Sequence, residues 1–446
     1  MSATPSSSSP SRTGGSPGHG AFDDAEHSQH WVAAYLGNLR RISREARWFL
    51  FGSLLVGFAW STFMLLFNLY LKERGFPEGL IGRVLSSQSF GTVAMALPAA
   101  VLVSRVSPRL VLIISSLGVA LAFSWQTFAG GMLAIAVAAF VAGGMLAFAR
   151  VISSPFLMTY STPSERAHVF SLSFAVMLGA GLVANFGAGS LHQFIADRIG
   201  SSVDAYRWVL LMACSAAVIA MIVYSRIPSA IVGQKSDRIP WREFWPAKGR
   251  LLFRLTFPFF LVGLGAGLII PFLNLYFRNR FGLSTQMIGV YYGLVQLTMI
   301  ISVMIGPELA RRYGMVRTIV ATEVASLPFM LVLAFTYNLP LATGAFLIRG
   351  GLMNLGVPIA SNYMMERVGS ADRALANSWS MLAWTLSWAI MAGLGGWMIE
   401  HWGFTWPLLI ASGLYVAASI TYWIFFHDQE IYAGKPAVGV LRPGDE

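Results

Sequence analysis

Three charged side chains lie inside segments that are otherwise apolar, and any chemistry would start from them. Arg150 and Arg349 each stand within a long hydrophobic stretch, and Glu323 stands within another. A charge inside a bilayer costs from about 2.5 kcal/mol to far more, so such a residue usually has a function. A guanidinium offers a rigid fork of donors that fits carboxylate, sulfate or phosphate. The two arginines therefore indicate a site for an anionic or zwitterionic solute.

Small residues surround Arg150 on its predicted helix. Ala147, Ser153 and Ser154 lie one turn away and leave room beside the guanidinium, which favours contact with a solute. The alternative is a structural arginine, which either extends toward the lipid headgroups or binds a backbone carbonyl freed near Pro155. The sequence leaves both interpretations open.

The composition shows which solvent surrounds these segments. Of 446 residues, 56% are hydrophobic and 11% are charged, and the mean hydropathy is +0.62, far outside the range of soluble proteins. Apolar stretches long enough to cross about 30 Å of hydrocarbon recur along the chain, and they are continuous rather than alternating. This pattern indicates an all-α membrane protein in a lipid bilayer and excludes a β-barrel. The net charge of +11 is then a property of the loops, and we expect no nucleic acid partner.

Twelve spans are predicted, six on each side of a polar segment. We expect a disordered tail and an amphipathic juxtamembrane helix over 1–47, although a plain extension of the first span is an alternative for the helix. Two six-helix bundles follow at 48–226 and 251–427, with a cytoplasmic linker at 227–250 and a polar tail at 428–446. The spans are placed at about 48–71, 80–103, 109–129, 132–160, 168–196, 206–226, 251–277, 285–307, 315–336, 338–365, 373–399 and 404–427.

The basic residues predict the orientation. Most of the 31 Lys and Arg residues fall on the side of the membrane that holds both termini, when twelve spans are assumed. Because basic loops stay in the cytoplasm, both termini are expected to be cytoplasmic, in a cell inner membrane.

Catalytic and metal-binding groups are not indicated. Cys214 is the only cysteine, which excludes a disulfide within the chain and gives no basis for a cysteine-based metal site. A membrane enzyme would need His, Asp or Glu clustered near one headgroup plane, and the sequence has no such cluster. We therefore predict no enzyme activity, no cofactor and no metal. A receptor or scaffold of the same fold is not separated from a carrier by the residues alone.

An internal repeat relates the two predicted bundles. Asn68, Tyr70 and Arg74 close the first span, and the same three residue types recur 206 positions later, from Asn274, at the end of the seventh span. The Leu-Ile-Gly run that ends at Gly82 returns 207 positions later as Met-Ile-Gly. Each copy holds six spans, an even number, so both copies insert with the same orientation and are related by an axis along the membrane normal.

Amides occupy equivalent places in the two copies. Asn68 and Asn274 fall near the outer ends of their spans, and Gln88 and Gln296 fall similarly in spans two and eight. An amide can bind a solute hydroxyl or carboxylate, and it can equally cap carbonyls at a helix end. Aromatic residues are candidates for an amphipathic pocket wall, with belt or lipid-facing positions as the alternative. These are Trp60, Tyr291, Tyr292, Trp384 and Trp388.

The loop after the second span of each copy resembles the signature loop of the major facilitator superfamily, Gly-x-Leu-Ala-Asp-Arg-x-Gly-Arg-Lys. In the first copy the likeness lies in Leu102 and Arg105. In the second copy it includes Arg312 and Gly314, although Arg311 takes the acidic position of the signature. The resemblance implies a twelve-helix transporter whose signature loop forms an inner gate, with Arg105, Arg312 and Gly314 as gating residues. Plain positive-inside anchors are the alternative for the two arginines.

The resemblance also implies which spans line the central cavity: one, four, seven and ten. Arg150 and Arg349 stand in spans four and ten, so both would face the solute. They are 199 residues apart rather than 207, so their depths should differ by about 12 Å of helix, with Arg349 nearer the outer side. Glu323 stands in span nine, which the resemblance places at the periphery. It is expected to form a structural pair with Arg349 or, alternatively, to couple transport to protons.

The predicted function is secondary active transport of a small, anionic or zwitterionic organic solute by alternating access, with a coupling ion as a further candidate partner. A multidrug/proton efflux antiporter of the same superfamily is the alternative. The span-five Gly-Pro of the superfamily's antiporters is absent, and no carboxylate is expected in the cavity. Glycines in spans five and eleven should allow the halves to slide against each other. We expect a monomer.

Overall fold

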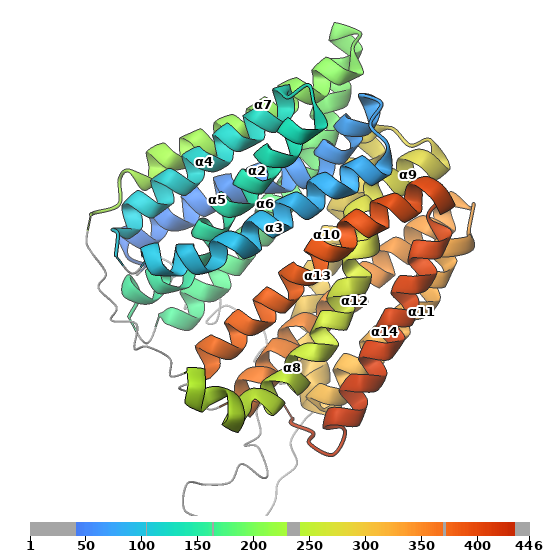
Figure 1. The fold of residues 1–446 in the computed structure, drawn as a ribbon. Helices are drawn as coiled ribbons and strands as arrows, with labels where there is room; N and C mark the ends of the chain where they lie inside the picture. The colour runs from blue at the N-terminus through green and yellow to red at the C-terminus, as the bar shows by residue number, and fades with distance from the viewer. Residues whose placement is uncertain (1–41, 104, 163–164, 230–240, 369–371, 433–446) are drawn as a thin grey trace, which may run out of the picture.

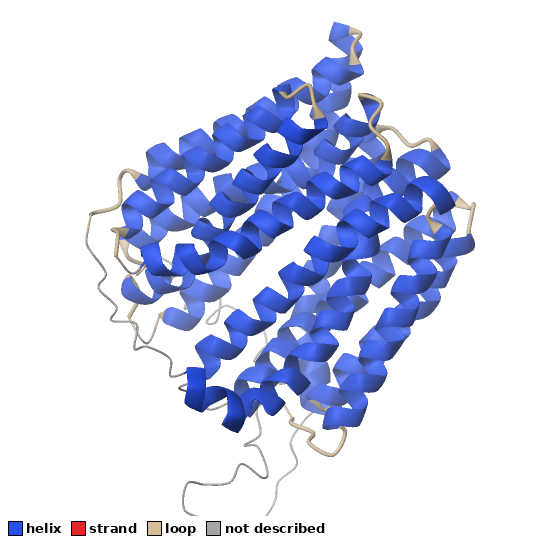
Figure 2. Ribbon diagram, viewed as in Figure 1, coloured by secondary structure: helices blue, strands red, loops and turns tan. Residues whose placement is uncertain are grey.

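The protein folds into a bundle of long helices in a computed structural model that describes residues 42–103, 105–162, 165–229, 241–368 and 372–432. Within these ranges the chain forms helices and connecting loops without a strand (Figure 2). The helices of the first half are α2 (Arg44–Glu73), α3 (Glu78–Val103), α4 (Pro108–Phe128), α5 (Met132–Thr159), α6 (Arg166–Ile199) and α7 (Ser202–Tyr224). Those of the second half are α8 (Trp241–Ile269), η1 (Ile270–Phe272), α9 (Leu273–Phe281), α10 (Thr285–Tyr313), α11 (Met315–Phe335), α12 (Leu339–Arg367), α13 (Arg373–Trp402) and α14 (Thr405–Phe426).

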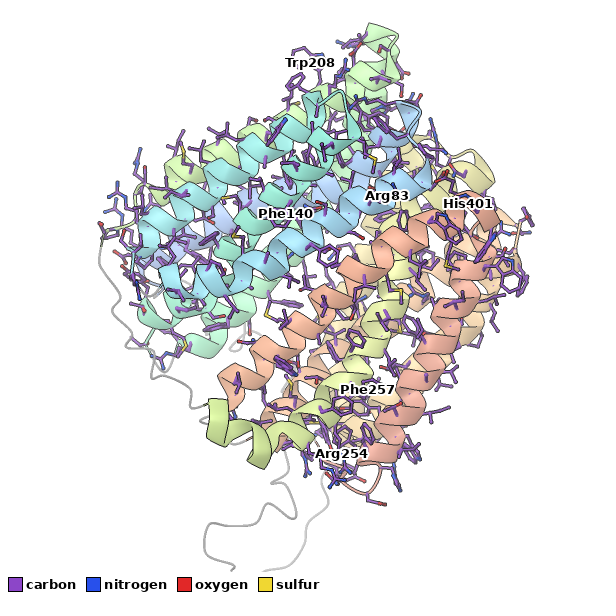
Figure 3. All side chains as sticks on the ribbon, in the orientation of Figure 1. Arg83, Phe140, Trp208, Arg254, Phe257 and His401 are labelled. Carbon is purple, nitrogen blue, oxygen red and sulfur yellow. The ribbon has the colours of Figure 1, made fainter. Side chains whose placement is uncertain are left out.

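Eleven of these segments are long and apolar enough to cross a membrane, and each matches a predicted span. One of them runs through α8, η1 and α9 without a gap in the chain. The twelfth predicted span is α12, which is equally long but contains Arg349 and Asn354, and these polar residues lower its average hydropathy. The twelve-helix fold is therefore confirmed. Exposed apolar side chains such as Trp208, which points away from α7 in Figure 3, suit contact with lipid.

Two helices, α2 and α8, begin earlier in the chain than the first and seventh predicted spans. Only residues from 42 onward of the predicted juxtamembrane helix are described, and those from Arg44 already belong to α2. The rest of that prediction lies outside the described residues. In addition, α8 begins at Trp241, within the segment 227–250 that was predicted to be a linker.

The two six-helix bundles meet along two pairs of helices, α3 with α13 and α6 with α10. Figure 1 shows α3 and α13 running side by side along the boundary between the bundles. Glycines of the repeat make these contacts close: a Cβ on Gly82 would lie 2.5 Å from the carbonyl oxygen of Ala392, and one on Gly289 would lie 2.6 Å from that of Asn185. Gly82 and Gly289 are the repeated glycines, so the repeat marks the interface between the halves.

Hydrogen bonds between the bundles are concentrated at one end of the molecule, opposite to the end that holds Arg44 and Phe426. We name this hydrogen-bonded end the closed end. There Arg278 bonds Glu73 at 3.2 Å, and Asn279 donates to Glu78 at 2.8 Å. Glu400 accepts from the backbone N–H of Gly79 at 3.0 Å. Between these contacts and the other end, which we name the terminal end, the bundles enclose the cavities described below.

The chain beyond α14 folds back onto the start of α11. Glu430 accepts hydrogen bonds from the backbone N–H groups of Val316 and Arg317, at 2.7 and 3.2 Å, and the N–H of Met315 donates to the carbonyl of Ile431. A carboxylate at a helix N-terminus satisfies free N–H groups and interacts favourably with the helix dipole. Glu430 thus supplies the acidic cap that the α10–α11 loop lacks, because Arg311 stands at the acidic position of the signature.

Replacing Glu430 with alanine should lower the stability of the second bundle by about 1 kcal/mol, the typical loss for removing a helix cap. The measurement is the thermal unfolding midpoint of the purified protein in detergent. Asp428→Ala is the matched control, since its side chain is 84% exposed and contacts only the neighbouring His427 among the ion pairs of the described residues. Equal midpoints for Glu430→Ala and Asp428→Ala would show that the cap contributes nothing.

Candidate functional site

Two adjoining cavities lie between the bundles. The smaller, of about 230 Å³, is lined by residues of α2, α10 and α12 near the closed end. The larger, of about 450 Å³, extends toward the terminal end along α8, α11, α12, α13 and α14. Ile270, Met353 and Asn354 line both cavities, so the two are parts of one space. Most of the wall is apolar, and the few polar side chains on it are the candidates for recognising a solute.

Arg349 enters this space from α12. Its side chain lines the smaller cavity, and the residue is 4% exposed. One guanidinium nitrogen, Nη2, donates to the hydroxyl of Tyr415 at 3.0 Å, while Nε has no hydrogen-bond partner among the described residues. A buried donor left unpaired costs roughly 1–3 kcal/mol, and more when the group is charged.

Arg150 enters from the opposite bundle, on α5. It lines the larger cavity, and its guanidinium lies over the ring of Trp60, 5.6 Å from the ring centroid. Trp60 in turn lines the smaller cavity. No ion pair involves Arg150 in the described part of the chain. As expected from the sequence, the two arginines lie at different depths, with Arg349 nearer the closed end.

Glu323 lies on the wall of the larger cavity and not at the periphery, which corrects the position expected from the sequence. Its Oε2 accepts a hydrogen bond from Ser419 at 2.8 Å. The predicted pair with Arg349 is wrong: no Glu323–Arg349 ion pair within 4.0 Å occurs among the described residues. The two side chains instead bind different residues of α14: Arg349 bonds Tyr415, and Glu323 bonds Ser419, one helical turn further on.

The four predicted amides divide between the cavity and the closed end. Gln296 lines the smaller cavity, whereas Gln88 is buried in the first bundle, where its backbone packs against Gly143. Asn68 and Asn274 are buried and lie outside both cavities. Their side-chain nitrogens donate to the carbonyls of Pro271 and Leu65, at 2.6 and 2.8 Å, so each asparagine bonds the opposite bundle. Asn68, Asn274 and Gln88, which were predicted to contact the solute, therefore do not line either cavity.

The reciprocal asparagine bonds follow from the sequence repeat and from one proline. Pro271 has no backbone N–H and cannot continue α8, which ends there in the short helix η1. The carbonyl of Pro271 accepts from Asn68, and the equivalent carbonyl of Leu65, also 206 positions away, accepts from Asn274. The closed end is thus held by a pair of bonds related by the pseudo-twofold axis.

The predicted gating residues lie at the terminal end. Arg105 and Arg312 are exposed, and Arg312 lies over the ring of Tyr313 at 5.4 Å. Gly314 has φ = +92°, a conformation that favours glycine, and it joins α10 to α11. A Cβ there would also meet the side chain of Glu430 at 2.3 Å. Gly314 therefore makes room for the acidic cap of α11.

Several polar wall residues escaped the sequence analysis. Asn185 lines the smaller cavity, Asn354 lines both, and Asn377 and Tyr415 line the larger. Asn354 had a visible signal, since it is an amide inside an apolar segment one and a half turns from Arg349. No sequence feature pointed to Tyr415, because a tyrosine in a membrane helix is equally compatible with a position at the membrane interface. Of the predicted aromatic wall, Trp60 and Tyr292 line the smaller cavity and Trp384 the larger.

Metal chemistry has no visible basis at this site. No group of three or more His, Cys, Asp and Glu side chains that could hold an ion occurs within residues 42–432 as far as they are described. The wall offers instead two guanidinium groups, one carboxylate, amides and aromatic rings. Such a wall binds an organic molecule by charge, hydrogen bonds and apolar contact.

Twelve membrane-length helices around a cavity with charged walls define a multi-pass membrane transport protein. The sequence confirms this class, since residues 49–371 match the model of the Major Facilitator Superfamily. This chain belongs to that superfamily. None of the curated proteins compared with it matches the sequence.

Solved structures of transporters have the same fold. A bacterial homologue of the human lysosomal transporter Spinster, in an inward-facing and occupied conformation, has a TM-score of 0.74 at 12% identity, with 86% of this chain and 97% of that chain covered. The nucleoside transporter NupG has a TM-score of 0.68 at 14% identity, with 86% and 99% covered. A D-xylose–proton symporter has a TM-score of 0.68 at 15% identity, with 88% and 98% covered. At these identities the likeness shows the fold alone.

Replacing both Asn68 and Asn274 with alanine should favour opening of the closed end. Each asparagine bond between the bundles contributes roughly 1 kcal/mol, so losing both should shift the balance by about tenfold or more. A cysteine at position 296, in a background in which Cys214 is replaced by serine, reports this opening. Its labelling by a membrane-impermeant thiol reagent from the closed-end side should rise in the double variant.

Gln193→Ala provides the matched control for the labelling experiment. Gln193 is half-buried near the same end and bonds Asp197 on its own helix, so its loss removes no hydrogen bond between the bundles. Labelling that is equally slow in the double variant and in Gln193→Ala would mean that the asparagine bonds do not hold this end closed.

Proposed function

We propose that this protein is a secondary active transporter that moves a small anionic or zwitterionic organic solute by alternating access. The observation that carries the proposal is the pair of arginines, which reach one space from opposite bundles and have no carboxylate partner among the described ion pairs. Two cations beside an apolar wall repel each other and favour an anionic occupant. The wall residues then serve as binding groups and not as catalysts.

The geometry of the two arginines supports contact with one solute. Tyr415 accepts from one of the five N–H donors of Arg349 and so fixes the orientation of the planar guanidinium, which leaves other donors for a solute. Arg150 is held by the ring of Trp60 and leaves its N–H groups to the cavity. Gln296 and Asn354 add hydrogen-bonding groups between them. An acidic group on the solute would bind one or both guanidinium groups.

Movement of the solute would require the bundles to tilt. The proposed moving units are the bundles at 48–226 and 251–427, which meet along α3 with α13 and α6 with α10 through glycine contacts. In this structure the contacts at the closed end hold the bundles together there. Breaking them and closing the terminal end would expose the cavity to the opposite side of the membrane.

A multidrug/proton antiporter remains the second candidate, and one observation favours it. Glu323 lies on a wall that also contains Trp384 and Tyr422, and a carboxylate beside aromatic rings suits a lipophilic cation. Against it stands the charge of the wall, where the guanidinium groups of Arg150 and Arg349 outnumber that single carboxylate.

The proposed location is the inner membrane of a cell, with both termini in the cytoplasm and the protein acting as a monomer. The excess of basic residues on the side of the termini supports this orientation. The terminal end would then face the cytoplasm, and the closed end would face outward.

Arg150→Ala should weaken binding of an anionic solute by roughly 10- to 100-fold, because a charge-assisted hydrogen bond is lost. Arg349→Lys should weaken it similarly, since a lysine keeps the charge but loses the planar fork. The measurement is thermal stabilisation of the purified protein by a panel of organic anions and lipophilic cations, followed by flux of the best ligand into proteoliposomes.

Arg311→Ala is the matched control, because this arginine is exposed and pairs with Glu308 on the surface of α10. It should bind anions as the unmodified protein does. Stabilisation by cations and not by anions would overturn the proposed solute class in favour of the antiporter. Anion binding that persists unchanged in Arg150→Ala would remove Arg150 from the site.

A further inference from the structure

One carboxylate on the cavity wall, that of Glu323, has no cationic partner among the described residues. Ser419 donates to Oε2 of Glu323, and the described residues offer this side chain no other hydrogen bond and no ion pair. Of the Lys and Arg side chains that the structure describes, only Arg150 and Arg349 lie on the walls of the two cavities. Neither of them pairs with Glu323.

Glu323 and Arg349 are bonded to different residues of α14. Tyr415 binds Arg349 and Ser419 binds Glu323, and these two residues are four positions apart on one helix. Four residues correspond to roughly 6 Å along the helix axis. Each group thus bonds a neutral hydroxyl and the described residues show no ion pair between them, so the wall of the second bundle keeps two separate, opposite charges. An ion pair between them would have cancelled this polarity.

The larger cavity itself carries one charge of each sign, and they come from different bundles. Arg150 projects from α5 of the first bundle and Glu323 from α11 of the second, and both line the same 450 Å³ space. A carboxylate in an apolar wall costs several kcal/mol unless a cation or a proton compensates it. A solute with a cationic nitrogen and an acidic group would compensate both residues at once.

We infer that the solute is zwitterionic, with Glu323 binding its ammonium group and Arg150 binding its acidic group. This inference rests on the proposed transport function and narrows its solute class to amino-acid-like molecules. A solute bound in this way connects the two bundles directly. Its binding would draw α5 and α11 together. A simple anion held only by the arginines would not bind Glu323 and so would not engage α11.

The other wall residues fit such a solute. Asn354, Asn377 and Tyr415 offer donors and acceptors in the same cavity, while Trp384 and Phe259 offer an apolar surface for a side chain. The rings of these two aromatic residues lie 5.8 Å apart and form one continuous surface.

The test compares each of the common L-amino acids with its N-acetyl derivative, which keeps the carboxylate and loses the ammonium group. Binding is measured as thermal stabilisation of the purified full chain in detergent. At least one amino acid should bind the unmodified protein tenfold or more tightly than its N-acetyl form. Glu323→Gln keeps the size of the side chain and should reduce this preference to within about twofold, while binding of the N-acetyl form is retained.

Two further variants make the comparison specific. Glu323→Asp keeps the charge but withdraws it by one methylene, and should leave an intermediate preference even if Glu323→Gln proves difficult to fold. Glu308→Gln is the matched control, because Glu308 lies on the surface of α10 and pairs with Arg311. The control should keep the full preference for the amino acid.

Three outcomes would overturn the inference while the proposed function stands. The first is that N-acetyl acids bind as tightly as the free amino acids, and the second is that the preference survives in Glu323→Gln. The third is proton uptake that accompanies transport of an N-acetyl acid and disappears in Glu323→Gln, which would make Glu323 a proton carrier. If no anion and no amino acid binds, the proposed transport of acidic solutes fails as well.

Discussion

The cost of placing a charge in an apolar environment governs the centre of this protein. Each of the three charged side chains there is stabilised by a different neighbouring group. Arg349 uses the hydroxyl of Tyr415, Arg150 uses the ring of Trp60, and Glu323 uses the hydroxyl of Ser419. All three partners are neutral, so the charges are held in position without being cancelled. A wall of this kind keeps its electrostatic attraction for a solute, whereas direct ion pairs within the protein would have removed it.

The closed end depends on a different use of polar groups. Asn68 and Asn274 satisfy carbonyls of the opposite bundle, so their amides hold the bundles together and do not reach a solute. The glycines that follow them in the repeat let α3 approach α13 and α10 approach α6. Duplication explains why these contacts occur twice, since two copies of one surface related by a twofold axis meet each other reciprocally. The most conspicuous repeat in the sequence is therefore part of the interface between halves.

The central cavity is less symmetric than the closed end. Arg150 and Arg349 are 199 residues apart and so do not occupy equivalent positions of the repeat. In the second bundle α14 contributes Tyr415, which bonds Arg349, and Ser419, which bonds Glu323. The C-terminal segment adds a further asymmetry, because Glu430 replaces the missing acidic residue of the α10–α11 loop. The two copies thus share a framework but differ in the wall of the cavity and in the cap of α11.

The sequence by itself determined the membrane environment, the twelve spans, the doubled architecture and the two arginines that line the cavity. These are properties of composition and of spacing along the chain, and they can be read because a bilayer requires each crossing segment to be a continuous apolar helix of about 20 residues. Only the tertiary structure decided that Glu323 lies on the cavity wall and that Asn68 and Asn274 bond the opposite bundle. Hydropathy gives the position of a residue along the membrane normal, but the rotation of its helix decides which neighbour it meets. That rotation is set by packing between segments that are hundreds of residues apart.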